Sequence, residues 1–220
     1  MKLQRGLTLI EMVIAISLLA IMISAIVFSF DGSKSRAQVL LAAMEEYTGA
    51  MERIKTDTSC YPKTLVALQD RKAAEGTGQS YCGADLSLQW NGPYVKSAST
   101  KAGVVVSGQP VIAMAQLSPD MTLRFARQTS AFGGTNGVAT WKWFIVADGV
   151  PKEILTQALL ACNGETAVVA AGSTATAAAG TRKCSKNGDS PGYAIDTLGL
   201  VAAADETPGS LAILFSESRK

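Results

Sequence analysis

The fold is decided by the junction between Met1-Lys2-Leu3-Gln4-Arg5-Gly6 and the apolar stretch that follows it. That stretch, residues 7–30, reads LTLIEMVIAISLLAIMISAIVFSF. Glu11 is the only ionisable residue in the second stretch. At about 1.5 Å per residue the stretch predicts a helix roughly 36 Å long, enough to span the apolar core of a bilayer. An ordinary secretion signal has its small-residue cleavage site after the apolar stretch; Gly6 precedes it, so a cut there would keep the helix. A carboxylate inside such a segment is costly unless it is paired, which makes Glu11 a candidate functional residue.

This arrangement resembles the class III signal of type IV prepilins and the related pseudopilins. The resemblance implies that a prepilin peptidase cuts between Gly6 and Leu7 and methylates the new N-terminus at Leu7. It also implies that Glu11 pairs with the N-terminus of a neighbouring subunit during assembly. Burying a carboxylate and an ammonium together costs far less than burying either alone. The alternative is a plain N-terminal anchor with a stray glutamate.

The overall composition narrows the possible functions. The chain has 20 Lys and Arg against 18 Asp and Glu, and the net charge of +2 falls to zero once Lys2 and Arg5 leave with the leader. We therefore expect no electrostatic partner such as nucleic acid. The chain has no histidine, which excludes Ser-His-Asp and Cys-His nucleophile systems and imidazole-based metal sites. We expect neither an enzyme nor a cofactor or metal site.

The four cysteines are Cys60, Cys82, Cys162 and Cys184, and none has the tight spacing of a metal site. An even number outside the cytoplasm predicts disulfides. Three pairings are possible. We favour Cys60–Cys82 and Cys162–Cys184 because each closes a local loop, with free buried thiols as the alternative. Each bridge would contribute roughly 3 kcal/mol by restricting the unfolded chain.

Helical periodicity resumes after Asp31-Gly32-Ser33. Apolar residues then recur at three- and four-residue steps: Ala37, Leu40, Leu41, Met44, Tyr47, Met51 and Ile54. One long helix over residues 7–55 is predicted, with a break at Gly32 into two helices as the alternative. The expected organisation is a leader at 1–6, a transmembrane or filament-core helix at 7–30, its amphipathic continuation at 31–57 and a globular β-rich head at 58–220.

The head is expected to be an antiparallel sheet on which the long helix packs. Strands are predicted at 104–106, 111–115, 121–127, 138–147 and 211–215, with a hairpin connection at 132–137. The alternation in 121–125 is typical of a sheet with one solvated face. A short helix within 62–71 and an exposed loop at 75–80 precede the sheet. A second helix opens at Gly149-Val150-Pro151 and carries Cys162.

Two further patterns strengthen the resemblance. Trp90-Asn91-Gly92-Pro93-Tyr94 after the long helix resembles a segment of pilins and major pseudopilins. The later order of helix, cysteine, loop, cysteine and strand resembles the disulfide-bounded region of type IVb pilins. The six-residue leader and the Trp90–Tyr94 segment resemble type IVa pilins or pseudopilins instead. The subclass stays open.

Three other groups of residues are candidate sites. The acidic residues Asp189, Asp196, Asp205 and Glu206 lack EF-hand spacing, and solvated turns explain them better than calcium. The basic group Arg182, Lys183 and Lys186 is best explained as a solvated loop. The aromatic residues are expected in the core: Tyr47, Tyr61, Trp90, Tyr94, Trp141 and Trp143.

These observations favour a structural protein, the pilin of a bacterial type IV pilus. Its expected partners are further copies of itself, the prepilin peptidase and an inner-membrane assembly platform. Lys2 and Arg5 favour a precursor in the inner membrane with its head outside the cytoplasm, before it joins a surface pilus for adhesion or twitching motility. The alternatives are a pseudopilin of a type II secretion system or a minor pilin, and, in another class, a membrane-anchored extracytoplasmic enzyme.

Overall fold

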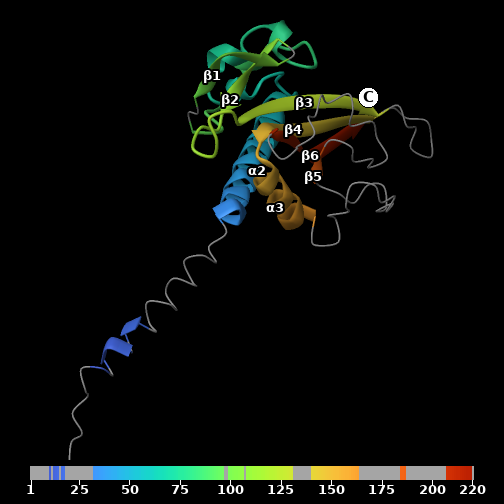
Figure 1. Ribbon diagram of the computed structural model, residues 1–220. Coiled ribbons are helices and arrows are strands. Elements are labelled where there is room, and N and C mark those ends of the chain that lie inside the picture. The colour runs from blue at the N-terminus through green and yellow to red at the C-terminus, as the bar shows by residue number, and fades with distance from the viewer. Residues whose placement is uncertain are drawn as a thin grey trace, which may run out of the picture.

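The computed structural model describes residues 10, 12–14, 16–17, 32–96, 99–106, 108–130, 140–163, 184–186 and 207–219 (Figure 1). Within these residues the chain is α+β, as expected, with helices packed on an antiparallel sheet. Most of the apolar segment 7–30 lies outside them. In the described part of the chain, no helix combines the length and apolarity needed to cross a membrane.

The helices and strands follow one another in a simple order. The α-helices are α2 (Gly32–Thr58) and α3 (Lys152–Asn163). Between α2 and the sheet lie four 3-10 helices: η1 (Leu65–Leu68), η2 (Arg71–Ala74), η3 (Thr77–Gln79) and η4 (Leu86–Leu88). The strands are β1 (Thr100–Val106), β2 (Gln109–Ala113), β3 (Thr122–Ser130), β4 (Thr140–Val150), β5 (Cys184–Lys186) and β6 (Gly209–Arg219). They form one sheet in the order β1-β2-β3-β4-β6-β5, with every neighbouring pair antiparallel.

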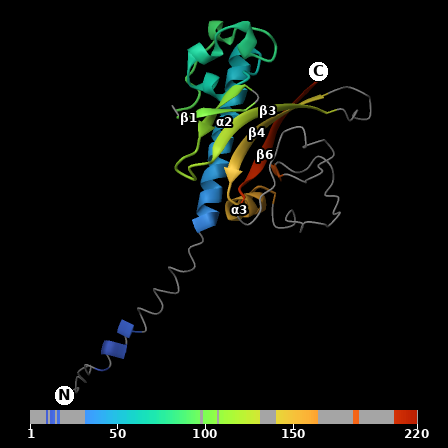
Figure 2. The same ribbon diagram turned by 45° about the horizontal axis from the view of Figure 1, so that its top comes forward.

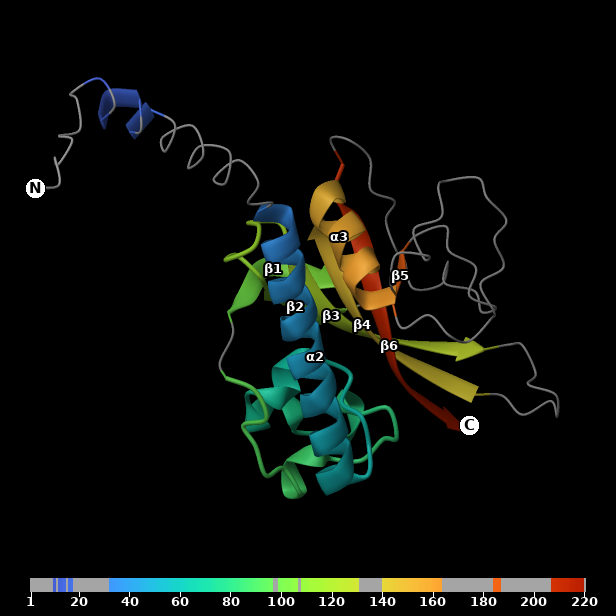
Figure 3. The same cartoon turned by 90° about the horizontal axis from the view of Figure 1, so that it is seen from below.

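Helix α2 forms because its apolar residues recur with helical spacing and share one buried face. That face is buried from Ala37 to Ile54, as the periodicity predicted. The helix ends where the Thr58 hydroxyl donates to the Ile54 carbonyl at 2.7 Å and Ser59 adopts a φ of 57°. Helices α2 and α3 lie side by side over the same face of the sheet (Figure 3).

The segment between α2 and the sheet surrounds the C-terminal end of α2 (Figure 2). Leu65 and Leu68 are buried in η1, which confirms the short helix predicted there. The exposed loop expected at 75–80 is wrong in part, since it contains η3 and Ser80 is only 2% exposed. Ser80 forms a β-bridge with Pro62, so backbone pairing draws the end of this segment into the head.

The central hairpin and the entry to α3 follow the sequence closely. Strands β3 and β4 pair from Thr122↔Asp148 to Ser130↔Thr140, so the connection between them is a hairpin; its residues 131–139 lie outside the described part. Gly149 has a φ of 75°, and a Cβ there would lie 2.3 Å from the Asp120 carbonyl oxygen. Only glycine fits this position, both for its backbone angle and for the close approach.

The expectation of one solvated sheet face is wrong. Phe144, Val146 and Ala212 point away from the helices and are fully buried, and Ala126 on the same face is 9% exposed. An ion pair lies on this face as well: Arg124 Nε is 2.5 Å from Asp148 Oδ2. The period-two pattern located the strands correctly. Their charged side chains, however, pair with one another across the sheet and do not simply face solvent.

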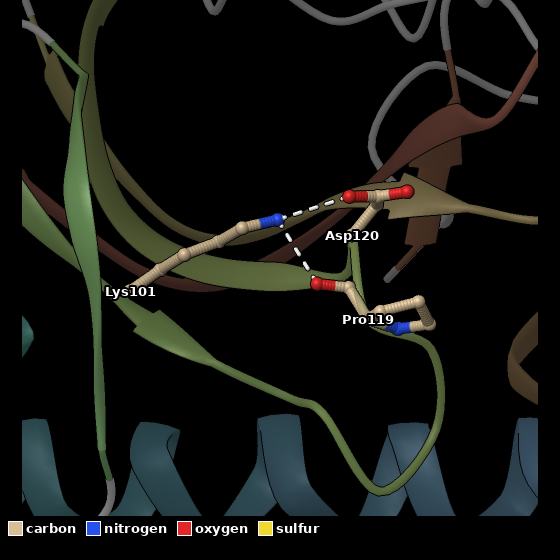
Figure 4. Close-up of polar contacts among 3 residues, drawn as sticks. All are labelled: Lys101, Pro119 and Asp120. Atoms are coloured by element: carbon tan, nitrogen blue, oxygen red, sulfur yellow. Dashed lines mark hydrogen bonds and ion pairs between the residues drawn. The ribbon is translucent and has the colours of Figure 1, made fainter.

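The far edge of the sheet is tied to the turn before β3. Lys101 on β1 donates to the Pro119 carbonyl at 3.0 Å and to Asp120 Oδ1 at 3.2 Å (Figure 4). The Asp120 side chain is 77% exposed, so this pair contributes little stability and mainly orients β1.

Candidate assembly site

The residues with the strongest functional signal, Gly6, Leu7 and Glu11, lie outside the described residues. The structure does describe their helical neighbours. Five apolar side chains there are between 53% and 68% exposed: Ile10, Met12, Val13, Ile14 and Ile16. Since large apolar side chains grouped on a surface normally mark a contact with lipid or protein, this segment needs a covering partner.

Helix α2 follows later in the chain and is held in the head by apolar packing. Leu40, Met44, Met51 and Ile54 are completely buried in the main core. Burying each such side chain stabilises the fold by about 1.5–3 kcal/mol. The head therefore anchors α2 firmly through this packing.

The Trp90–Tyr94 segment clamps the C-terminal half of α2. The Tyr94 hydroxyl donates to Asp57 Oδ2 at 2.7 Å, and Arg53 donates to the Tyr94 carbonyl at 3.2 Å. Trp90 Nε1 donates to the Ala67 carbonyl at 2.9 Å, and its ring meets the Tyr94 ring edge-on at 5.7 Å. Desolvation, followed by the hydrogen bond to Asp57, raises the pKa of Tyr94.

Gly92 is required within this clamp. A Cβ at Gly92 would lie 2.6 Å from the Trp90 ring and 2.8 Å from the Tyr94 ring. The motif that resembles pilins and pseudopilins thus packs the head against α2, and its two aromatic rings pack edge-on against each other.

The Cys60–Cys82 disulfide closes the segment that follows α2, with the pairing favoured from the sequence. The same segment is also held by backbone hydrogen bonds from Lys63 N to Gln79 O (2.8 Å) and from Tyr81 N to Tyr61 O (3.1 Å). The bridge and these bonds fix the start of the head directly against the end of α2.

An aromatic cluster next to this bridge joins α2 to the sheet. The Tyr61 ring centroid lies 4.6 Å from that of Trp143 and 5.8 Å from that of Phe215. Its hydroxyl donates to Glu52 on α2, and burial together with this hydrogen bond raises the pKa of Tyr61. Burial likewise raises the pKa of Tyr47 to about 12. Tyr47, Tyr61 and Trp143 are buried in the core, as the sequence indicated.

The second disulfide, Cys162–Cys184, joins the last turn of α3 to the edge strand β5. Asn163 strengthens this junction in a way that the sequence did not reveal. Its Nδ2 donates to the Cys184 carbonyl at 2.9 Å, and its Oδ1 accepts from Cys184 N at 3.1 Å. Asn163 thus pairs with β5 like the backbone of one more strand.

The remaining candidate groups have no described site. The acidic group Asp189, Asp196, Asp205 and Glu206 and the basic residues Arg182 and Lys183 lie outside the described residues, while Lys186 ends β5. Among the residues that the structure describes, no group of three His, Cys, Asp or Glu side chains could hold a metal ion.

Comparisons with known proteins bear on the N-terminus and on the class of the chain. Residues 1–27 match the family model described as the prokaryotic N-terminal methylation motif, a stretch that includes Gly6, Leu7 and Glu11. The chain is 34% identical over 86 residues to the type II secretion system core protein G of Klebsiella pneumoniae, an alignment that covers 37% of this chain and 61% of that relative. No solved structure matches the chain.

Together the methylation motif, the helix packed on an antiparallel sheet and this similarity point to one class: the N-terminus has the motif of a prepilin-like precursor. The chain is similar to type IV pilin-like proteins, a class that includes pilins and pseudopilins.

Proposed function

We propose that this chain is a structural subunit of a pilin-like filament. The observation that carries the proposal is the methylation motif at residues 1–27, together with the described apolar side chains inside it, which are more than half exposed in the single chain. Such a segment can be covered by lipid before assembly and by the same segment of other copies afterwards. The head would then decorate the outside of the filament.

In this proposal a prepilin peptidase cuts between Gly6 and Leu7, and Leu7 becomes N-methylated. Glu11 then lies about one helical turn from the new N-terminus and pairs with the N-terminus of a neighbour. The parts of the chain act as leader (1–6), membrane and filament-core helix (7–30), helical stem (31–57) and head (58–220). The precursor resides in the inner membrane with its head outside the cytoplasm, and no step requires catalysis by this chain.

The test is Glu11→Ala together with Glu11→Gln in the native host. Both variants are expected to be cleaved and methylated normally but to be missing from filaments, because the apolar helix can still enter the membrane while the charge pair is lost. Ser17→Ala is the matched control in the same segment, since its hydroxyl only donates to the Val13 carbonyl at 2.8 Å. Normal filaments from Glu11→Ala would contradict the proposal.

Two machines could use such a subunit. We place the type IV pilus first because a large head with a second disulfide-bounded region resembles type IVb pilins, and most of this chain lies outside the alignment to core protein G. The similarity itself favours the second candidate, a pseudopilin of a type II secretion system. Deleting the gene would remove surface filaments in the first case and block secretion of folded proteins in the second.

A further inference from the structure

Arg127 on β3 has an unusual environment on the face of the sheet that carries the helices. Its guanidinium carbon lies 3.8 Å from the centroid of the Trp141 ring and 4.2 Å from that of Tyr81, with Trp143 at 5.8 Å. A guanidinium is attracted to the faces of aromatic rings. Because the group is planar, stacking occupies its faces and leaves the N–H donors at its edge available.

The N–H donors of Arg127 have no acceptor in the described part of the chain. The groups that contact its guanidinium there are aromatic rings. The two other arginines best suited for comparison differ in this respect. Arg124, three residues earlier on the same strand, is paired with Asp148. Arg53 donates to the Gly49 and Tyr94 carbonyls. Arg127 is therefore a half-buried cation that is oriented by its surroundings but has no anionic partner among the described residues.

A cation in this state is suited to bind a carboxylate. The fork of N–H donors matches the two oxygens of a carboxylate, and such charge-assisted pairs are short and strong. The aromatic rings keep water off the faces of the guanidinium and fix its direction, so little side-chain entropy is lost when a partner arrives.

We propose that Arg127 binds a carboxylate side chain of a neighbouring copy of this chain. The inference rests on the proposed function, which places many copies side by side. Charge complementarity supports it, because three exposed glutamates have no partner among the described residues: Glu46 on α2, Glu75 after η2 and Glu153 at the start of α3. One of these three supplies the carboxylate, and the pair fixes the heads relative to one another.

The test is charge reversal in the full chain, expressed in the native host. Arg127→Glu is expected to reduce the protein recovered in sheared filaments about tenfold, since like charges then face each other across the contact. Adding Glu46→Arg, Glu75→Arg or Glu153→Arg to Arg127→Glu should restore filaments in one of the three double variants. Restoration by none of them would overturn the inference.

Two controls separate this contact from folding and from the proposed function. Arg127→Gln keeps an uncharged polar side chain on the rings and should reduce filaments while both disulfides still form. Lys72→Gln removes an exposed cation of the head that has no role in the clamp or the proposed contact, and should leave filament yield unchanged. Failure of the proposed function would appear instead as normal filaments from Glu11→Ala, or as an uncut leader, whatever residue occupies position 127.

Discussion

The two faces of the sheet are built by different means. The face that carries α2 and α3 belongs to one continuous apolar core, to which Leu123, Ile145 and Ile213 contribute from three neighbouring strands. The opposite face has a small apolar cluster around Phe144 and Val146, flanked by charged pairs. The first face depends on burial, which is strong and non-directional, and the second depends on polar contacts that also fix the positions of the strands.

The polar contacts of the second face link three strands. Asp148 on β4 accepts from Arg124 on β3 at 2.5 Å and from the buried Ser210 hydroxyl on β6 at 2.6 Å. Lys142 on β4 also contacts Glu217 on β6 at 2.8 Å. Such pairs lose much of their energy when one strand slides along the other. They therefore favour the observed pairing register over registers shifted by one or more residues.

The largest effects are expected from two adjacent residues of β4 that point to opposite faces. Ile145→Ala on the helix side should lower the free energy of unfolding by about 2–5 kcal/mol, and Phe144→Ala on the other side by about 3–5 kcal/mol, since both leave cavities. Urea unfolding of the detergent-solubilised chain measures both. Leu88→Ala is the control, because Leu88 is 78% exposed and its loss should change little. A cost near zero for Phe144→Ala would mean that the second face is not a core.

A smaller effect is expected from breaking the ion pair on the second face. Asp148→Ala should cost about 2–3 kcal/mol, because it removes the carboxylate that accepts from the Arg124 guanidinium and from the Ser210 hydroxyl. The double change Arg124→Met with Asp148→Leu should recover most of that loss. Asp120→Ala is the matched control at an exposed pair, where about 0.5 kcal/mol or less is expected. Equal costs for Asp148→Ala and Asp120→Ala would contradict this account of the second face.

Alkaline pH should weaken the helix-side core selectively. The pKa of Tyr47 is raised to about 12, so the folded chain holds this proton while the unfolded chain releases it near pH 10. The stability from the neutral phenol is complete below about pH 10 and falls as the pH rises towards 12. In a profile of unfolding free energy against pH, Tyr47→Phe should flatten the slope between about pH 10 and 12. An unchanged slope in Tyr47→Phe would show that Tyr47 does not cause the loss of stability at alkaline pH.

The smallest effect is expected at the clamp on α2. Tyr94→Phe removes the hydroxyl that donates to Asp57 but keeps the ring against Trp90, and should cost about 0.5–1 kcal/mol. Thermal unfolding is sensitive enough to detect this change. Gly92→Ala, which forces a Cβ against both rings, should cost more than Tyr94→Phe, and the reverse order would show that the clamp is loosely packed.

The parts of the fold that could be predicted from the sequence are those governed by local patterns. Helical spacing between Ala37 and Ile54 predicts α2, and Gly149-Val150-Pro151 predicts the start of α3. Strand β5 could not be predicted, since its three residues are held by Asn163 and by pairing with β6. The buried second face was also missed, because Arg124 and Asp148 look solvated until the fold brings them together.

For the candidate site, the methylation motif that includes Gly6, Leu7 and Glu11 could be predicted from the sequence because it is a local pattern. The proposed partner of Glu11 would come from another copy, and the environment of Arg127 depends on Tyr81, which is far away in the sequence. Contacts of this kind arise only from the tertiary and quaternary arrangement.

The most direct test of the central claim, that this chain is a processed filament subunit, is mass spectrometry of material sheared from the surface of the native host. The account predicts an abundant N-terminal peptide that begins at Leu7 and is one methyl group heavier than the unmodified peptide. The same peptide confined to the membrane fraction would favour the pseudopilin over the surface pilus. An intact N-terminus at Met1 would contradict the account.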